Sequence, residues 1–118
     1  MKLSTSTGDF SGFEDAVAER VKHFKGTKFQ YINLEQTGAH TSSILCEDGD
    51  AWKRLADDWG EAAALAGVTY VVSRAPVLDA YEELTDEHYA VTLRAIRRSI
   101  EICHMLGIPR TVVHASSN

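Results

Sequence analysis

The chain has 118 residues, of which 44% are hydrophobic and 25% are charged, and its formal net charge at pH 7 is −5. This length suits one compact domain with its own core, and the acidic balance argues against nucleic acid, because phosphate binding favours a basic face. No apolar run approaches the ~20 residues that a membrane span needs, and the chain starts without the apolar core of a signal peptide. The one dense basic cluster, Arg94, Arg97 and Arg98, is expected to be a solvated helix face.

Two cysteines, Cys46 and Cys103, bear on the redox compartment and on metal binding. They are too few and too far apart for a disulfide framework or a zinc knuckle. Cys103 falls in a helical apolar stripe and is expected to be a small core residue. Cysteine use of this kind favours a reducing compartment, so we expect a cytoplasmic protein.

One structural phrase recurs three times: the end of a helix, a glycine, and a short apolar strand that stops at a polar residue. The glycines are Gly26, Gly67 and Gly107, at intervals of 41 and 40 residues. Strands that alternate with helices favour a parallel sheet, and such sheets bind ligands at the carboxyl ends of their strands. The repeat therefore predicts the location of a site before its chemistry is considered.

The chain opens with a predicted strand over residues 2–7, which Gly8 and Asp9 end with a turn. A capping box of Ser11 and Glu14 then starts a helix. Apolar residues in this helix recur at spacings of four, four and three, which predicts one buried face; they are Phe13, Val17, Val21 and Phe24.

A second strand over residues 29–35 leads into a polar stretch over residues 36–50, which we interpret as a long loop. Loops of this length after a strand often carry function. A helix over residues 51–66 follows. Its inner stripe combines two tryptophans and a leucine with four small alanines that let the helix lie close to a sheet; the stripe is Trp52, Leu55, Ala56, Trp59, Ala62, Ala63 and Ala66.

The third strand, residues 68–73, is rich in β-branched residues and nearly continuous in its apolar character, which is typical of a strand buried on both faces. After a loop over residues 77–84, Thr85 caps a helix that Gly107 ends, and a last strand covers residues 110–114. The apolar face of this helix is expected to join the core; it consists of Tyr89, Leu93, Ile96, Ile100 and Cys103.

Polar side chains gather where the predicted strands end. Ser6, Glu35, Arg74 and His114 close the four strands in turn, and Ser116 follows the last. In a parallel sheet these ends meet at one edge, so a carboxylate, a guanidinium, an imidazole and hydroxyls would share one rim. Hydroxyls exchange hydrogen bonds with sugar hydroxyls, arginine grips oxyanions, and histidine or glutamate can move protons. The set predicts a site for a polyhydroxylated or phosphorylated small molecule.

Structural alternatives stay open for these residues. Glu35 and Arg74 could form a structural salt bridge, His114 could be a satisfied histidine at a strand end, and the serines and threonines of the first strand suit strands and turns. The sequence has no dinucleotide fingerprint, phosphate loop, zinc-protease helix motif or nucleophile elbow.

Four phrases stand in order along the chain: residues 2–7 as the first strand, 31–35 as the second, Ala75-Pro76 after the third, and 111–114 as the fourth. Together they resemble the N-terminal half of the xylose isomerase-like barrels, which include sugar phosphate isomerases and epimerases. The resemblance implies an α/β fold in which residues 1–118 form a single partial domain. That domain would be the parallel four-strand βαβαβαβ half of a (β/α)8 TIM barrel.

The resemblance also implies carbohydrate chemistry, namely the interconversion of sugars by metal-assisted proton transfer in the complete barrel. Glu35 and His114 match positions at the mouth of the family's barrel, and with Ser6, Arg74 and Ser116 they would bind a sugar or sugar phosphate. Arg74 stands where many members have a histidine before Ala-Pro. The family's divalent metal (Mn, Mg or Zn) and its proton-transferring glutamates belong to the second half of the barrel. We therefore assign no catalytic residue and no metal ligand to this chain and expect it to be inactive alone.

A (β/α)8 barrel takes roughly 250 residues, and half of one would leave two strand edges and an apolar face uncovered. We therefore expect a homo-oligomer, or association with the C-terminal half of the same barrel. A non-catalytic half-barrel that binds a sugar or a phosphorylated molecule is the alternative function. A flavodoxin-like doubly wound domain would require reordered strands and helices on both faces of the sheet. Endonuclease activity on DNA is disfavoured by the acidic charge.

Overall fold

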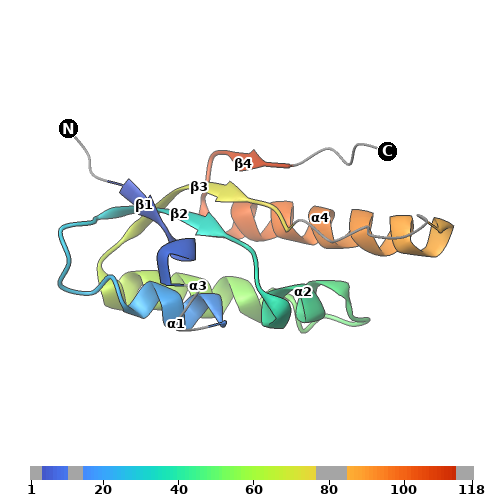
Figure 1. Ribbon diagram of the computed structural model, residues 1–118, viewed down its shortest axis with the longest axis horizontal. Coiled ribbons are helices and arrows are strands. Elements are labelled where there is room, and N and C mark those ends of the chain that lie inside the picture. The colour runs from blue at the N-terminus through green and yellow to red at the C-terminus, as the bar shows by residue number, and fades with distance from the viewer. Residues whose placement is uncertain (1–3, 11–14, 77–84, 114–118) are drawn as a thin grey trace.

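The computed structural model describes residues 4–10, 15–76 and 85–113, and it contains one four-stranded, all-parallel sheet (Figure 1). The strands lie in the order in which they occur along the chain, and each pairs in parallel with the next; they are β1 (Ser4–Ser6), β2 (Tyr31–Glu35), β3 (Thr69–Arg74) and β4 (Thr111–Val112). The predicted alternation of strands and helices is confirmed. The doubly wound alternative is wrong, because a flavodoxin-like sheet places its first strand between the second and third.

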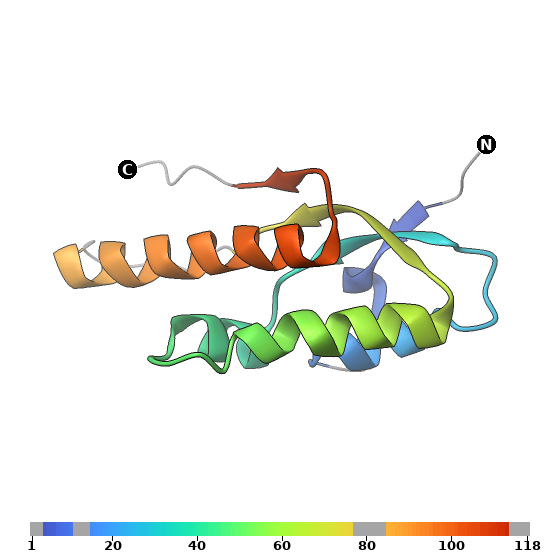
Figure 2. The same ribbon diagram turned by 180° about the vertical axis from the view of Figure 1, so that it is seen from behind.

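A 3-10 turn, η1 (Thr7–Phe10), follows β1, and four helices connect the strands: α1 (Val17–Lys22), α2 (Ala39–Cys46), α3 (Lys53–Ala66) and α4 (Asp86–Leu106). Both views show the helices gathered on one side of the sheet (Figure 1, Figure 2). The other side of the sheet is not covered by any helix among the described residues.

Helix α2 lies in the stretch that the sequence suggested was a loop. The helix begins after Gly38, whose φ of 103° is accessible to glycine, and it has no capping side chain of its own. Asp15, far back in the chain, supplies the cap: its carboxylate accepts hydrogen bonds from the backbone N–H groups of Ala39 at 3.2 Å and His40 at 2.7 Å. A cap donated from a distant segment leaves no local signal in the sequence.

The helix side of the sheet forms the core. Ile32 and Leu34 of β2 and Tyr70 of β3 are buried there against Trp59 of α3, which is 1% exposed. The alternate residues of β2 are only partly buried, and Thr69 and Arg74 of β3 are exposed. The expectation that the third strand is buried on both faces is therefore wrong, because the second face has no covering layer.

The register between β2 and β3 contains one irregularity. Ile32 pairs with Tyr70, whereas the next residue, Asn33, pairs with Val72. Val71 is thus an extra residue of β3, as in a β-bulge. From this point on the two strands run in step to their carboxyl ends.

Gln36, directly after β2, is fully buried and polar. Its side-chain Nε2 donates hydrogen bonds to Ser73 Oγ at 2.9 Å and to the Ser99 carbonyl of α4 at 3.1 Å, and it lies 3.5 Å from Cys103 Sγ. The expected core position of Cys103 is confirmed, since this thiol is buried and free. One amide therefore links two strands to a helix across the core.

The arginines of α4 differ from the solvated face that the sequence suggested. Arg94 and Arg98 are half-buried and donate to backbone carbonyls at the end of α2: Arg94 to Cys46, and Arg98 to Leu45 at 2.9 Å. Arg98 also donates to the Glu47 carbonyl at 2.7 Å. These carbonyls lack helical partners and lie at the negative end of the helix dipole, so two cations stabilise them.

We predict that Arg98→Ala lowers the free energy of unfolding by about 1–3 kcal/mol, because it removes the donor for three carbonyls and the guanidinium that lies 5.5 Å from the centre of the Trp52 ring. Arg97→Ala is the matched control, since Arg97 is its exposed neighbour, and it should change stability by no more than about 0.5 kcal/mol. Urea denaturation followed by tryptophan fluorescence measures both. Equal losses in the two variants would show that the contacts of Arg98 with the end of α2 do not stabilise the fold.

Candidate functional site

The carboxyl ends of β2 and β3 bring two of the predicted site residues together. Glu35 and Arg74 are register partners in these neighbouring strands, so their side chains leave the same face of the sheet. This is the face that no described helix covers. Glu35 is half-buried and Arg74 is exposed. The ion pairs of the described residues do not include one between the two.

Glu35 is held by the turn that follows β1. Its backbone N–H donates to Thr7 Oγ1 at 2.9 Å, and Thr7 is completely buried. The Glu35 carboxylate lies directly over Gly8, where a Cβ atom would be 2.3 Å from Oε2. Only glycine leaves room for the carboxylate in this position, so η1 fixes where the negative charge lies.

Ser6 belongs to the same corner of the sheet. Its Oγ accepts a hydrogen bond at 3.1 Å from the Gly8 backbone N–H, which leaves the hydroxyl proton for another acceptor. Asn33 is the register partner of Ser6 and is half-buried on the same face as Glu35. The uncovered face is therefore polar near the strand ends, whereas the sequence suggested an apolar one.

Two predicted site residues, His114 and Ser116, lie outside the described residues. Among the described residues, the site thus consists of Ser6, Asn33, Glu35 and Arg74. Sequence reasoning missed Asn33 and Gly8. Asn33 could have been found from the strand alternation, because it precedes Glu35 by two positions; Gly8 could not, because only the folded chain brings it under the carboxylate.

A metal centre has no support in this part of the chain. The described residues contain no group of three histidine, cysteine, aspartate or glutamate side chains that could hold an ion. Nor does any helix over those residues have the length and apolar character to cross a bilayer. The site consists of one carboxylate, one guanidinium, a hydroxyl and an amide, which suits hydrogen bonding to hydroxyls and to an oxyanion.

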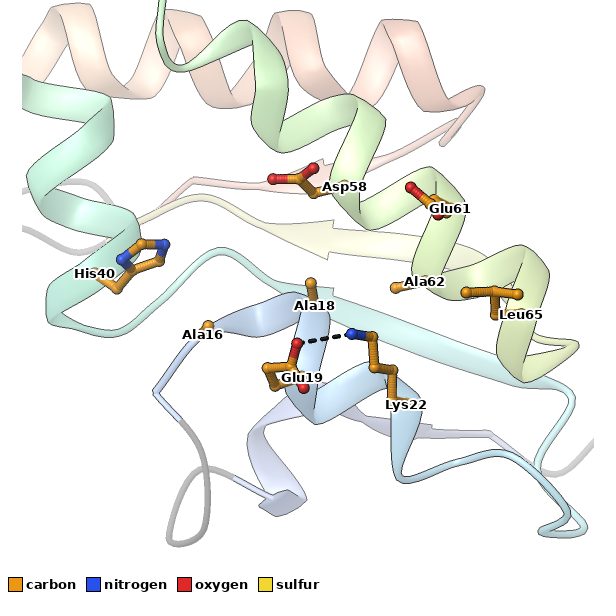
Figure 3. A pocket seen from close by; sticks show the side chains of 9 residues that line it. All are labelled: Ala16, Ala18, Glu19, Lys22, His40, Asp58, Glu61, Ala62 and Leu65. Atoms are coloured by element: carbon orange, nitrogen blue, oxygen red, sulfur yellow. Dashed lines mark hydrogen bonds and ion pairs between the residues drawn. The ribbon is translucent and has the colours of Figure 1, made fainter.

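A groove lies among the helices, away from the strand ends. It has a volume of about 300 Å³ and lies between α1, α2 and α3. Glu19, Asp58 and Glu61 make it acidic, and Lys22 Nζ lies 2.7 Å from Glu19 Oε1 within it (Figure 3). The hydrogen bond and charge of Glu19, helped by the other two carboxylates, raise the pKa of Lys22. The groove contains no residue of the strand-end site.

Comparisons with known proteins give no relative: no family model, no curated protein and no solved structure matches this chain.

We predict that Gly8→Ala keeps the fold and displaces the Glu35 carboxylate, because the added Cβ would occupy its place and the end of a glutamate side chain is free to move. The ¹³C resonance of the Glu35 carboxyl carbon should shift clearly in the NMR spectrum of the variant. Gly60→Ala is the control, since its Cβ would meet only a Leu106 methyl group at 3.2 Å. A Glu35 resonance that stays in place in Gly8→Ala would show that the carboxylate does not lie there.

Proposed function

We propose that this chain is the substrate-orienting half of a barrel enzyme of the sugar phosphate isomerase or epimerase kind. In the complete barrel, metal-assisted proton transfer would interconvert two sugars. The observation that carries the proposal is the register of the sheet. It places Glu35 and Arg74 opposite each other at the carboxyl ends of adjacent parallel strands, on the uncovered face. In α/β barrels this end of the strands carries the active site.

The strand order gives further support. Four parallel strands in chain order, with their helices on one side, form the repeating arrangement of a singly wound barrel. The uncovered face would then be the barrel interior. The polar residues at its carboxyl end would line the mouth, where a hydroxylated ligand can replace water.

The roles of the side chains follow from their chemistry. The exposed Arg74 guanidinium presents a planar fork to a phosphate or carboxylate group of the ligand. The Glu35 carboxylate accepts hydrogen bonds from sugar hydroxyls, and Ser6 and Asn33 offer further donors beside it. In this proposal these groups bind and orient the ligand, and the other half of the barrel would supply the metal.

Ligand binding without turnover is the second candidate function. The four residues that would hold a sugar phosphate, Ser6, Asn33, Glu35 and Arg74, all belong to this chain. A half-barrel could therefore act as a binding module. The two candidates share one ligand class and differ in whether a second half adds proton transfer.

We expect titration with D-fructose 6-phosphate to shift the ¹⁵N-HSQC peaks of Ser6, Asn33, Glu35 and Arg74. Arg74→Gln should weaken binding of the phosphate ester about tenfold or more, because a charge-assisted pair is lost, and should spare D-fructose. Glu35→Gln should weaken binding of both sugars.

Arg54→Gln is the control for the arginine, because Arg54 is exposed on α3, outside the site. It should leave both affinities unchanged. Peak shifts confined to the helices, or equal effects of Arg54→Gln and Arg74→Gln, would rule out the strand-end site.

We also expect the purified 118-residue chain to show no aldose–ketose interconversion with Mn²⁺, Mg²⁺ or Zn²⁺ added, because it lacks the second half of the barrel. A coupled assay over a panel of sugar phosphates measures this. Metal-dependent turnover by the chain alone, abolished by EDTA, would contradict the proposal that the metal and the proton-transferring residues belong to the other half.

A further inference from the structure

Helix α4 carries an apolar stripe that the core does not use. Its four residues, Tyr89, Leu93, Ile96 and Ile100, were expected to be buried, and we call them the α4 seam. Tyr89 is 59% exposed and Ile100 is 43% exposed, while the other two are half-buried. The buried residues of α4 are instead Ala95, Ser99, Ile102 and Cys103. The expectation for Tyr89 and Ile100 is therefore wrong.

Tyr89 and Ile100 are exposed to solvent, whereas Leu93 lines a groove with Trp52 and Arg98. At 100° per residue the four residues of the α4 seam fall within about 60° of the helix surface, roughly a third of a turn from the centre of the buried face. Arg94 and Arg98 reach α2 from the opposite flank, and Leu106 faces Gly60 of α3. In Figure 1, the N-terminal part of α4 also extends beyond the end of the sheet. A helix from another molecule can approach this flank.

The spacing of the seam makes it self-complementary. Successive seam residues are four, three and four positions apart, a spacing that is the same in both chain directions. It is also the spacing found in helix pairs with knobs-into-holes packing. When two copies of α4 lie antiparallel about a twofold axis, Tyr89 of one faces Ile100 of the other, and Leu93 faces Ile96. Every seam residue then has an apolar partner, as an isologous interface requires.

We propose that the α4 seam is the interface of a homodimer, in which a second copy of this chain packs its α4 antiparallel against the first. The charges beside the seam permit this arrangement. Arg97 falls beside Ala90 of the partner subunit rather than beside another arginine. A single helix pair buries less than a standard interface, so the dimer belongs to the weak, concentration-dependent class. The inference is independent of the proposed function, since no strand-end residue takes part.

Sedimentation equilibrium tests the interface over a concentration series that extends to about 1 mM, the range in which weak dimers form. The chain should pass from monomer to dimer, and Ile100→Glu should weaken dimerisation about tenfold or more. Met105→Glu and Leu65→Glu are matched controls, because both residues are large, apolar and exposed but lie off the seam. They should leave the dimerisation constant unchanged.

Disulfide trapping tests the register. In a Cys46→Ser background, an equimolar mixture of Tyr89→Cys and Ile100→Cys chains should form a disulfide-linked heterodimer under mild oxidation. Either variant alone should not, because identical positions lie about 16 Å apart along the antiparallel pair. These variants also report dimerisation without adding a charge.

Three outcomes would overturn the proposal. The first is a monomer at every concentration. The second is equal weakening by Ile100→Glu and Met105→Glu. The third is a trapped pair that does not depend on combining positions 89 and 100. None of these outcomes changes the result expected from the sugar phosphate titration. Failure of the proposed dimer is therefore distinguishable from failure of the proposed strand-end site.

Discussion

The buried side chain of Gln36 is the contact on which the geometry of the strand ends depends. Its amide nitrogen joins Ser73 of β3 to the Ser99 carbonyl of α4, and its backbone N–H donates to the Arg74 carbonyl at 3.1 Å. Glu35 immediately precedes Gln36, and Arg74 immediately follows Ser73, so one buried residue fixes the backbone of both charged groups. In a dry core such a bond has no water to replace it, which makes the link rigid.

The two faces of the sheet differ in character. One face holds the apolar residues that pack against α3 and α4, and the other carries polar residues at its carboxyl end. Because strand residues alternate between faces, adjacent residues such as Leu34 and Glu35 lie on opposite faces of the sheet. The position of the site can therefore be precise without the charged groups entering the core.

Much of the fold could be predicted from the sequence because its signals are local. An apolar run after a glycine marks each of the last three strands, and parallel order then brings Glu35 and Arg74 to one edge. Helix α2 was missed because its cap, Asp15, lies more than twenty residues away in sequence. For α4, periodicity identified an apolar face but could not say what covers it. Gly8 was missed because its closeness to Glu35 exists only after folding.

The extra residue in β3 determines which side chains of that strand lie on the same face of the sheet as Glu35. Without the bulge, the register set by Ile32 and Tyr70 would continue unchanged along both strands. Glu35 would then pair with Ser73 instead of Arg74. Arg74 would then point into the helix layer, where a guanidinium has no aqueous environment, and a serine would stand beside the carboxylate. A single inserted residue thus selects which chemistry the open face displays. Loss or gain of one position in β3 would therefore be a short evolutionary route from a charged strand end to a neutral one.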